Sequence, residues 1–446
     1  MTQTQSAPQP ATWSPPAQQP GTPAVQPATS QTASRRNAIA RWFDGTPGRM
    51  RAILILAAAM SVVFGLCAAQ GFRQSDGALT RAEENAAQLV RIQEIHTNLV
   101  SANADATNAF LVGGLEPPAQ RQHFVDSMAS AAGLIAEAAT AQPADQEALG
   151  ALNKTLLTYQ GLIEQARANN RQGLPIGSQY LRDANAVLQN DSLPLVQALV
   201  QANEDRTADE FGAVSDGTIW VLVSGVLTLL VFALTLRWLA RRTHRYINVP
   251  IAVGALLVLV TVIVGSVALS SAAGDASDTE ADAYADTLAM SRARIAAYDA
   301  RSNESLTLIA RGSGDAFDKA YQAAAGRVEE QLGKLSGTAA DDIRTDWDAY
   351  RSVHAEVRKR DGAGQWDSAV DLAIGTSKDP TNSVKTFQAF DQGSADELAN
   401  TSAAVTSNLS GSRNGLPPIG WLGLPIGIAA ALLVAWGMSQ RLEEYR

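Results

Sequence analysis

Four long stretches of the sequence contain no charged residue, and they determine how every other segment is interpreted. They cover residues 52–72, 218–236, 251–273 and 419–439, and each is 19 to 23 residues long. A helix rises about 1.5 Å per residue, so each stretch is long enough to cross a hydrocarbon core of roughly 30 Å. Tryptophans near their ends are typical of membrane–water interfaces. The pattern predicts four transmembrane helices.

Charged residues outside these stretches predict how the chain is oriented. Residues 35–51 carry five arginines against one acid, and residues 237–250 carry four arginines against none. The two long segments, 73–217 and 274–418, hold 9 basic against 18 acidic residues and 15 basic against 23 acidic residues, respectively. Because basic loops remain on the cytoplasmic side, we expect both termini inside the plasma membrane and both long segments outside.

This interpretation divides the whole chain. Residues 1–34 contain no charge and are rich in proline and glutamine, which predicts a disordered cytoplasmic arm. The predicted segments are the arm (1–34), a basic juxtamembrane segment (35–51), the first span (52–72), the first exported bundle (73–217), the second span (218–236), a basic cytoplasmic loop (237–250), the third span (251–273), the second exported bundle (274–418), the fourth span (419–439) and a cytoplasmic tail (440–446).

The first exported segment has a helical seam whose residues become smaller with distance from the membrane. Its members follow alternating three- and four-residue spacing and are Ile92, Ile95, Leu99, Ala102, Ala106, Ala109 and Gly113. Small residues let a neighbouring helix approach closely, and glycines and prolines at 113–118 end the helix. Further helices are expected at 119–140, at 145–170 and from 178 to the second span, with an interruption at Pro194.

The second exported segment has the same plan. After a turn at Gly312 to Gly314, helices are expected at 315–335, 339–360 and 382–410. An offset of 198 residues places Ala300 on Ala102 and Gly312 on Gly114, which indicates a duplication with partial identity. The predicted fold is therefore all-α: a polytopic membrane protein with two extracytoplasmic antiparallel four-helix bundles.

Reactive side chains are too scattered to predict an enzyme. The chain has four histidines and one cysteine, with no His-x-x-x-His pair and no phosphate-binding glycine loop. His96 and His123 are interpreted as surface or bundle-edge residues. The acidic exported segments argue against nucleic-acid binding, and we predict no catalytic residue, no metal and no cofactor.

Transmission of a signal across the membrane would need a cytoplasmic contact, because the cytoplasmic segments are too short for an output domain. The basic loop supplies the candidates for contact with a partner protein, which are Arg241, Arg242, His244 and Arg245. The positive-inside rule also explains these basic residues, because they would keep the loop on the cytoplasmic side.

One motif and the overall arrangement of segments resemble those of a known protein family. An exported four-helix bundle between two membrane helices resembles the ligand-binding half of bacterial chemoreceptors and sensor kinases. The plan of arm, four spans and two exported segments, together with "EIHTNLVSANADATNAFLVGGLEP" at 94–117, resembles an actinobacterial membrane sensor family encoded beside a glutamine-binding lipoprotein and the soluble serine/threonine protein kinase G. The resemblance implies a non-enzymatic sensor or signalling adaptor. It would relay the availability of aspartate, glutamate or glutamine from an amino-acid-binding lipoprotein to the cytoplasmic kinase.

The distal tips are the expected contact for the lipoprotein, because a tall bundle meets a tethered partner near its top or along its side. The tip candidates are Gly113, Gly114, Glu116, Arg121, Arg311, Gly312 and Phe317. A direct ligand pocket inside a bundle is the alternative at this end. Arginines that would pair with a ligand carboxylate there are Arg91, Arg121, Arg167 and Arg182.

Two other functions and two oligomeric states stay open on the sequence. The chain could be a transporter or transport accessory subunit, or an envelope scaffold that does not switch. Gly423 and Gly427 form a G-x-x-x-G pattern in the fourth span. This pattern is interpreted first as packing among the spans of one chain, and it also suits a homodimer.

Overall fold

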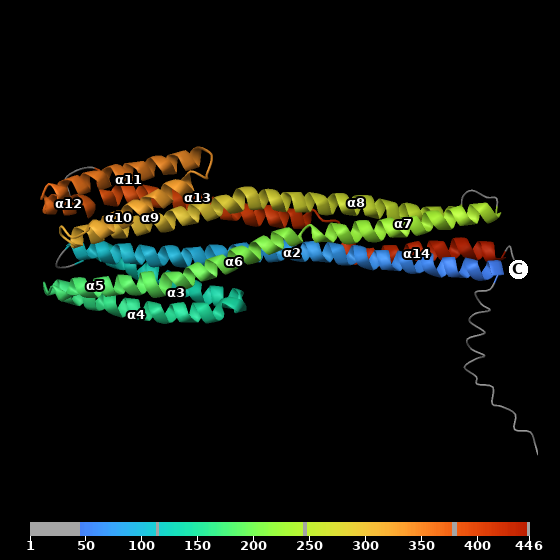
Figure 1. The fold of residues 1–446 in the computed structure, drawn as a ribbon, viewed down its shortest axis with the longest axis horizontal. Helices are drawn as coiled ribbons and strands as arrows, with labels where there is room; N and C mark the ends of the chain where they lie inside the picture. Colours follow the sequence, from blue (N-terminus) through green and yellow to red (C-terminus); the bar gives the residue numbers. More distant parts are fainter. Residues whose placement is uncertain (1–44, 113–115, 244–247, 377–380, 444–446) are drawn as a thin grey trace, which may run out of the picture.

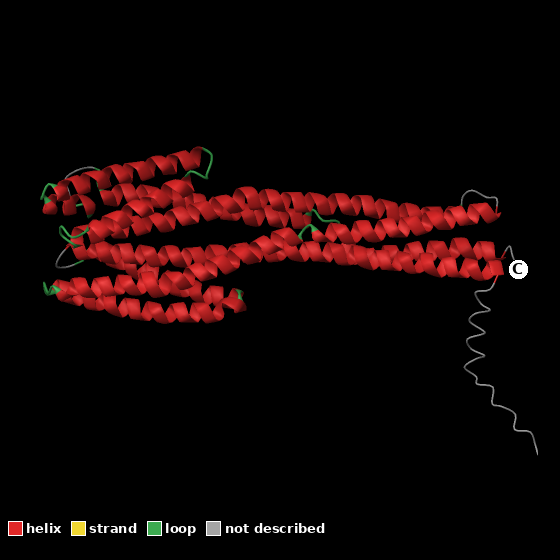
Figure 2. Ribbon diagram, viewed as in Figure 1, coloured by secondary structure: helices red, strands yellow, loops and turns green. Residues whose placement is uncertain are grey.

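The computed structural model describes residues 45–112, 116–243, 248–376 and 381–443. The predicted arm, Gly113, Gly114, His244 and Arg245 lie outside these residues, as does the side chain of Arg242. Within the described ranges all regular structure is helical and no strand occurs (Figure 2). The all-α prediction is therefore confirmed.

The helices follow one another with short connections. In chain order they are α2 (Gly45–Val112), α3 (Pro118–Ala141), the 3-10 turn η1 (Pro143–Asp145), α4 (Gln146–Arg171), α5 (Ile176–Val187), the π-helical turn η2 (Leu188–Ser192), α6 (Leu193–Ala213), α7 (Asp216–Thr243), α8 (Val249–Thr279), the π-helical turn η3 (Glu280–Tyr284), α9 (Ala285–Ile309), α10 (Asp315–Leu332), α11 (Thr338–Gly362), α12 (Trp366–Ala373), α13 (Ser383–Asn414) and α14 (Ile419–Glu443).

The apolar parts of α2, α7, α8 and α14 lie together at one end of an elongated molecule (Figure 1). Among the described residues, four helices are long and apolar enough to cross a membrane. Phe64 and Phe232 are buried between them, while Val226, Leu256 and Leu432 are exposed on the outside. Apolar side chains on the outer surface of a helix bundle are suited to lipid. The chain is a multi-pass membrane protein.

The G-x-x-x-G pattern of the fourth span packs within the chain. A Cβ atom on Gly65 of α2 would lie 2.5 Å from the Gly423 carbonyl oxygen, and one on Gly427 would lie 2.5 Å from the Ser61 carbonyl oxygen. These glycines let the backbones of α2 and α14 touch. The packing interpretation is thus confirmed, and the same face is occupied inside one chain.

Each bundle has one helical path that leads away from the apolar end, here called the outward leg, and one that leads back to it, the returning leg. The outward legs are continuous and the returning legs are not. α2 is one helix of 68 residues, about 100 Å long at 1.5 Å per residue. The other outward leg runs from α8 through η3 into α9 without a break. The returning legs are jointed, one at a turn at Val214 and Ser215 and the other at residues 415–418. Apart from the interruption at Pro194, the predicted fourth helix of the first bundle continues into the second span, and this continuity is wrong at the first joint.

Pro194 accounts for a second irregularity in the first returning leg. The π-helical turn η2 ends at Ser192, two residues before this proline. Proline lacks the N–H that would bond to the carbonyl four residues earlier, and a wider turn accommodates the loss. The predicted interruption at Pro194 is confirmed, as a local change of helix type.

Both joints are held by the same stretch of α2. Ser75 donates a hydrogen bond from its Oγ to the Val214 carbonyl oxygen at 2.8 Å. Arg73 donates from Nε to the Gly420 carbonyl oxygen at 3.0 Å, just beyond the second joint. Residues 71–75 of α2 therefore fix the points at which both returning legs enter the apolar end.

Beyond the joints the chain forms two bundles. The first bundle is made by α2, α3, α4 and the α5–α6 leg, and the second by α9, α10, α11 and α13 (Figure 1). The short helix α12 adds to the second bundle where the sequence analysis placed no element. We refer to the end of each bundle farthest from the apolar spans as its tip.

The two bundles share one hydrophobic core. α2 and α9 pack along each other between the bundles (Figure 1), and the buried cluster runs from Leu99 and Ala102 of α2 to Ala297 and Ala300 of α9. At this contact the buried Asn103 side-chain amide donates to the Ser302 hydroxyl at 2.9 Å. The small residues of the seam are predicted to let another helix approach α2 closely. One such helix is α9, from the second repeat of the same chain.

Candidate functional site

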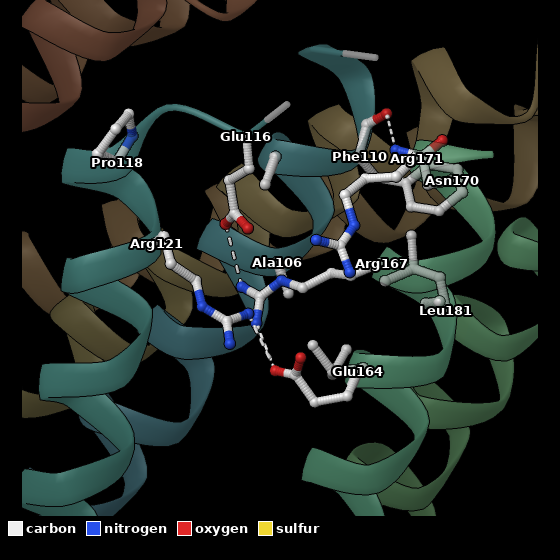
Figure 3. Close-up of a pocket in the computed structure, with 13 residues that line it drawn as sticks. Ala106, Phe110, Glu116, Pro118, Arg121, Glu164, Arg167, Asn170, Arg171 and Leu181 are labelled. Atoms are coloured by element: carbon white, nitrogen blue, oxygen red, sulfur yellow. Dashed lines mark hydrogen bonds and ion pairs between the residues drawn. The ribbon is translucent and has the colours of Figure 1, made fainter. Parts of the chain in front are cut away.

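A cavity of about 370 Å³ lies at the tip of the first bundle. Four helices line it, with Ala106 and Phe110 from α2, Arg121 from α3, Arg167 from α4 and Leu181 from α5 (Figure 3). The seam of α2 has narrowed to alanine at this height, so no large side chain fills the space between the helices. Along the seam of α2 the side chains change from leucine to alanine, as the sequence predicts. The cavity lies at this level, next to the residues predicted at the tip.

Ion pairs connect the walls of this tip cavity. Arg121 bonds to Glu164 at 2.9 Å, which joins α3 to α4. Arg167 bonds to Glu116 at 3.0 Å and to Glu164 at 3.1 Å (Figure 3). Glu116 stands just before α3, so Arg167 draws the entry of α3 onto α4. The cluster therefore holds together segments that contribute to the cavity wall.

Arg167 is the most enclosed of these arginines. Its side chain is 12% exposed, and its guanidinium carbon lies 4.1 Å from the centre of the Phe124 ring. Such a contact between a cation and an aromatic face stabilises the charge. The Nε atom is buried and has no hydrogen-bond partner among the described residues. Arg167 is held in the cavity wall by its ion pairs and by its contact with Phe124.

Arg171 adds a third guanidinium that the sequence analysis did not select. It lies one turn after Arg167 on α4 and extends toward the cavity (Figure 3). In the part of the chain that the structure describes, Arg171 forms no ion pair. Its signal in the sequence is the four-residue spacing from Arg167, which places both arginines on one helix face.

The cavity is electropositive within an acidic segment. Three guanidinium groups and two carboxylates line it, whereas residues 73–217 as a whole carry 9 basic and 18 acidic residues. Burial raises the pKa of Glu164, but the hydrogen bonds and charges of Arg121 and Arg167 outweigh it, so the pKa lies below its ordinary value. Glu164 therefore remains an ionised partner in mildly acidic conditions.

Two other predicted arginines lie elsewhere. Arg91 donates to the Gln88 side chain at 3.3 Å, one turn earlier on α2. Arg182 donates to the Gln179 side chain at 2.8 Å on the surface of α5. Neither lines the tip cavity. Of the four arginines proposed for a direct pocket, the fold brings Arg121 and Arg167 together.

The histidines of the first bundle have distinct surroundings. The His123 ring nitrogen Nδ1 lies 2.5 Å from an oxygen of Asp105, a carboxylate buried on α2. This hydrogen bond raises the pKa of His123 despite the opposing effect of burial. His96 is buried rather than on the surface, so its interpretation as a surface or edge residue is wrong.

At the tip of the second bundle, α12 packs against the end of α9. The Arg311 guanidinium lies 3.9 Å from the centre of the Trp366 ring, and the Trp366 indole donates to the Leu308 carbonyl oxygen at 2.8 Å. Gly312 is exposed in a left-handed conformation, and Phe317 packs half-buried against the shared core. The two tips therefore differ, because a tryptophan lies against the arginine of the second.

The opposite end of the molecule carries the other candidates. Arg241 is exposed in the last turns of α7, where the helix leaves the apolar region. Arg242 is the next residue of α7, and the loop with His244 and Arg245 lies outside the described residues. Contact of this end with a partner stays a prediction.

Comparison with curated proteins and with solved structures gave no match. Residues 78–212 match the family model described as an actinobacterial sensor domain. The match begins on α2 and ends on α6, so it contains the complete lining of the tip cavity. A sensor-domain match flanked by four apolar helices fits a sensor protein of a membrane.

Proposed function

We propose that this protein is a non-enzymatic transmembrane sensor and signalling adaptor of the plasma membrane. It relays the extracytoplasmic availability of aspartate, glutamate or glutamine, through a solute-binding lipoprotein, to a cytoplasmic serine/threonine kinase. Both termini and the loop after α7 lie in the cytoplasm, and both bundles lie outside. The charge balance of the segments and the resemblance of residues 94–117 support this assignment.

The continuity of the outward legs is the observation that carries the proposal. α2 extends from the cavity at the first tip to the apolar end without a break, and the leg from α8 to α9 does the same for the second bundle. A continuous helix transmits a displacement of its distal part to its membrane part. The sensor-domain match covers the distal part of one such leg.

The jointed returning legs give this transmission a structural basis. When α2 shifts, the bonds from Ser75 to Val214 and from Arg73 to Gly420 carry the shift to both joints. α7 and α14 then move relative to α2, which rearranges the cytoplasmic loop and tail. Such a change is a small sliding of packed helices. Disulfide cross-links that lock the bundles and leave the response intact would contradict this mechanism.

Partner contacts are assigned to the two ends of the molecule. The lipoprotein contacts the tips, at Glu116, Arg121 and Arg311, and the kinase contacts the basic residues that begin at Arg241. Support for the tips comes from their shared position at the end far from the spans (Figure 1).

A pull-down from native membranes tests the proposal. The chain carries a C-terminal tag, and membranes are prepared with and without added glutamate or aspartate before mass spectrometry. We expect a solute-binding lipoprotein and a cytoplasmic kinase, with recoveries that depend on the amino acid. A double variant, R241Q/R242Q, should lose the kinase and keep the lipoprotein. Recovery of permease or ATPase subunits would indicate transport instead, and recovery of no partner would indicate a scaffold.

A further inference from the structure

We propose that the tip cavity of the first bundle binds an acidic α-amino acid directly. This inference rests on the proposed sensing function and deepens it, because it gives the sensor a ligand site of its own. The lipoprotein is then one source of the ligand or a second input, and the isolated chain binds the amino acid without it.

The charges that line the cavity match those of such a ligand. Arg121, Arg167 and Arg171 line the cavity with three guanidiniums, and Glu116 and Glu164 line it with two carboxylates that already pair with Arg121 and Arg167. A bound amino acid joins this network, with its two carboxylates on the guanidiniums and its ammonium group on a glutamate. Guanidinium groups bind carboxylates through paired N–H donors. The lining has one positive charge in excess, and glutamate or aspartate carries one negative charge in excess.

An unpaired guanidinium shows where a carboxylate binds. Arg171 lines the cavity and has no ion-pair partner among the described residues. Its guanidinium can therefore take a ligand carboxylate without breaking an existing ion pair. It lies one helical turn after Arg167 on α4, so a small ligand held by Arg171 lies beside both arginines.

The size of the cavity limits the ligand. Ligand pockets span about 300–1,000 Å³, and this cavity of about 370 Å³ lies at the small end of that range. Ala106 and Ala109 line it and offer small apolar surfaces to an aliphatic chain. A single amino acid fits this description, whereas a long peptide does not.

The second tip predicts the stoichiometry. Arg311 lies over the Trp366 ring, which is anchored to Leu308, so the arginine at the second tip already has an aromatic partner. We therefore expect one amino acid bound per chain, although the chain contains two repeats.

Isothermal titration calorimetry of the purified full-length chain in detergent tests this inference. L-glutamate should bind with a stoichiometry of one. Glutarate, which lacks the ammonium group, and L-glutamine, which lacks the second carboxylate, should each bind at least tenfold more weakly. No heat of binding with L-glutamate at millimolar concentration would overturn the proposal.

A matched pair of variants localises the site. Arg171→Gln should weaken glutamate binding at least tenfold, because it removes the unpaired guanidinium from the cavity. Arg182→Gln removes the same charge from the surface of α5, outside the cavity, and should leave the affinity unchanged. Circular dichroism should show both variants folded. Equal effects of the two substitutions would assign any binding to general charge and would overturn the proposed site.

The result is separable from the test of the relay. Glutamate binding to the purified chain, combined with a pull-down that recovers no kinase, would support the cavity and refute the relay. Recovery of both partners from a chain that binds no glutamate would do the reverse.

Discussion

His96 and His123 show how one bundle shifts the pKa values of two imidazoles in opposite directions. His96 on α2 is enclosed by the shared core, and burial lowers its pKa to about 4. His123 on α3 is half-exposed and bonds to the buried Asp105 carboxylate, which raises its pKa. The ordinary value for both is 6.5. The two residues therefore make pH-dependent contributions of opposite sign to the free energy of unfolding.

His96 should destabilise the fold in acid. Between pH 6.5 and about 4 the unfolded chain binds a proton at this residue and the folded chain does not, so stability falls as the pH falls through this window. Thermal unfolding in detergent at pH 7.5 and pH 5.0 measures the effect. His96→Gln should lose less of its melting temperature between the two pH values than the parent chain does. An equal loss in both proteins would show that His96 takes up its proton in the fold.

His123 should have the opposite effect. Its raised pKa means that the stabilising charge–charge bond to Asp105 is fully present below pH 6.5 and is lost as the pH rises through the folded-state pKa. His123→Gln should therefore lower the melting temperature more at pH 5.5 than at pH 8.5. A penalty that does not change with pH would mean that the bond does not depend on the charge of the imidazole.

At the scale of the elements, the joints separate rigid from movable parts. The first joint packs on α2 through two glycines, since a Cβ atom on Gly217 would lie 2.4 Å from the Gly71 carbonyl oxygen and 2.3 Å from Ser75 Oγ. The backbone oxygen cannot move aside as a flexible side chain would. The start of α7 is therefore as close to α2 as two helices can come.

Gly217→Ala should push α7 away from α2 at this joint. We expect a lower melting temperature and an altered dependence of kinase recovery on glutamate in the membrane pull-down. Gly212→Ala on α6 is the matched control, because a Cβ atom there meets nothing within 4 Å. In a helix, alanine is favoured over glycine by about 0.8–1.0 kcal/mol, so the control should be neutral or slightly stabilising. Similar behaviour of the two variants would contradict the close contact at the joint.

Several elements could be predicted because their signals are local. Uncharged length reveals the four spans, and the glycines and prolines near residues 113–118 and 173–177 reveal turns of the first bundle. The joint at Val214 and Ser215 contains no helix-breaking residue, and α12 has only eight residues, so neither has a strong local signal. Pattern reasoning is weak for such short features.

Part of the candidate site could also be predicted, because some of its residues have local signals in the sequence. Arg121 and Glu116 follow a recognisable helix end, and Arg167 is an arginine on a predicted bundle helix. Arg171 faces the cavity while Arg182 does not, and this difference depends on how α4 and α5 are rotated against α2. Rotation is set by packing between helices that are distant in sequence. The pairing of α2 with α9 has the same origin.

At the scale of the whole molecule, the shared core predicts that the two bundles unfold together. Leu152 of α4 is fully buried in this core, and Leu157 on the same helix is 67% exposed. Replacing a buried leucine by alanine costs about 2–5 kcal/mol. Leu152→Ala should therefore reduce the protection of backbone amides in α10 and α11 of the second bundle as well as in the first, measured by hydrogen–deuterium exchange.

Leu157→Ala is the matched control and should leave the protection of both bundles unchanged. If Leu152→Ala affected the first bundle alone, the bundles would be independent folding units despite their contact.

α2 takes part in both bundles, in both joints and in the packing of the fourth span. In a genetic screen, mutations that alter the response and mutations that suppress them should both map to this helix. A substitution that weakens the response at the first tip should find its suppressors near residues 65–75 on the same helix, far away in space from the original defect. Both pairs of membrane helices should also change state together in such revertants, because α2 packs on α7 of one pair's returning leg and on α14 of the other's.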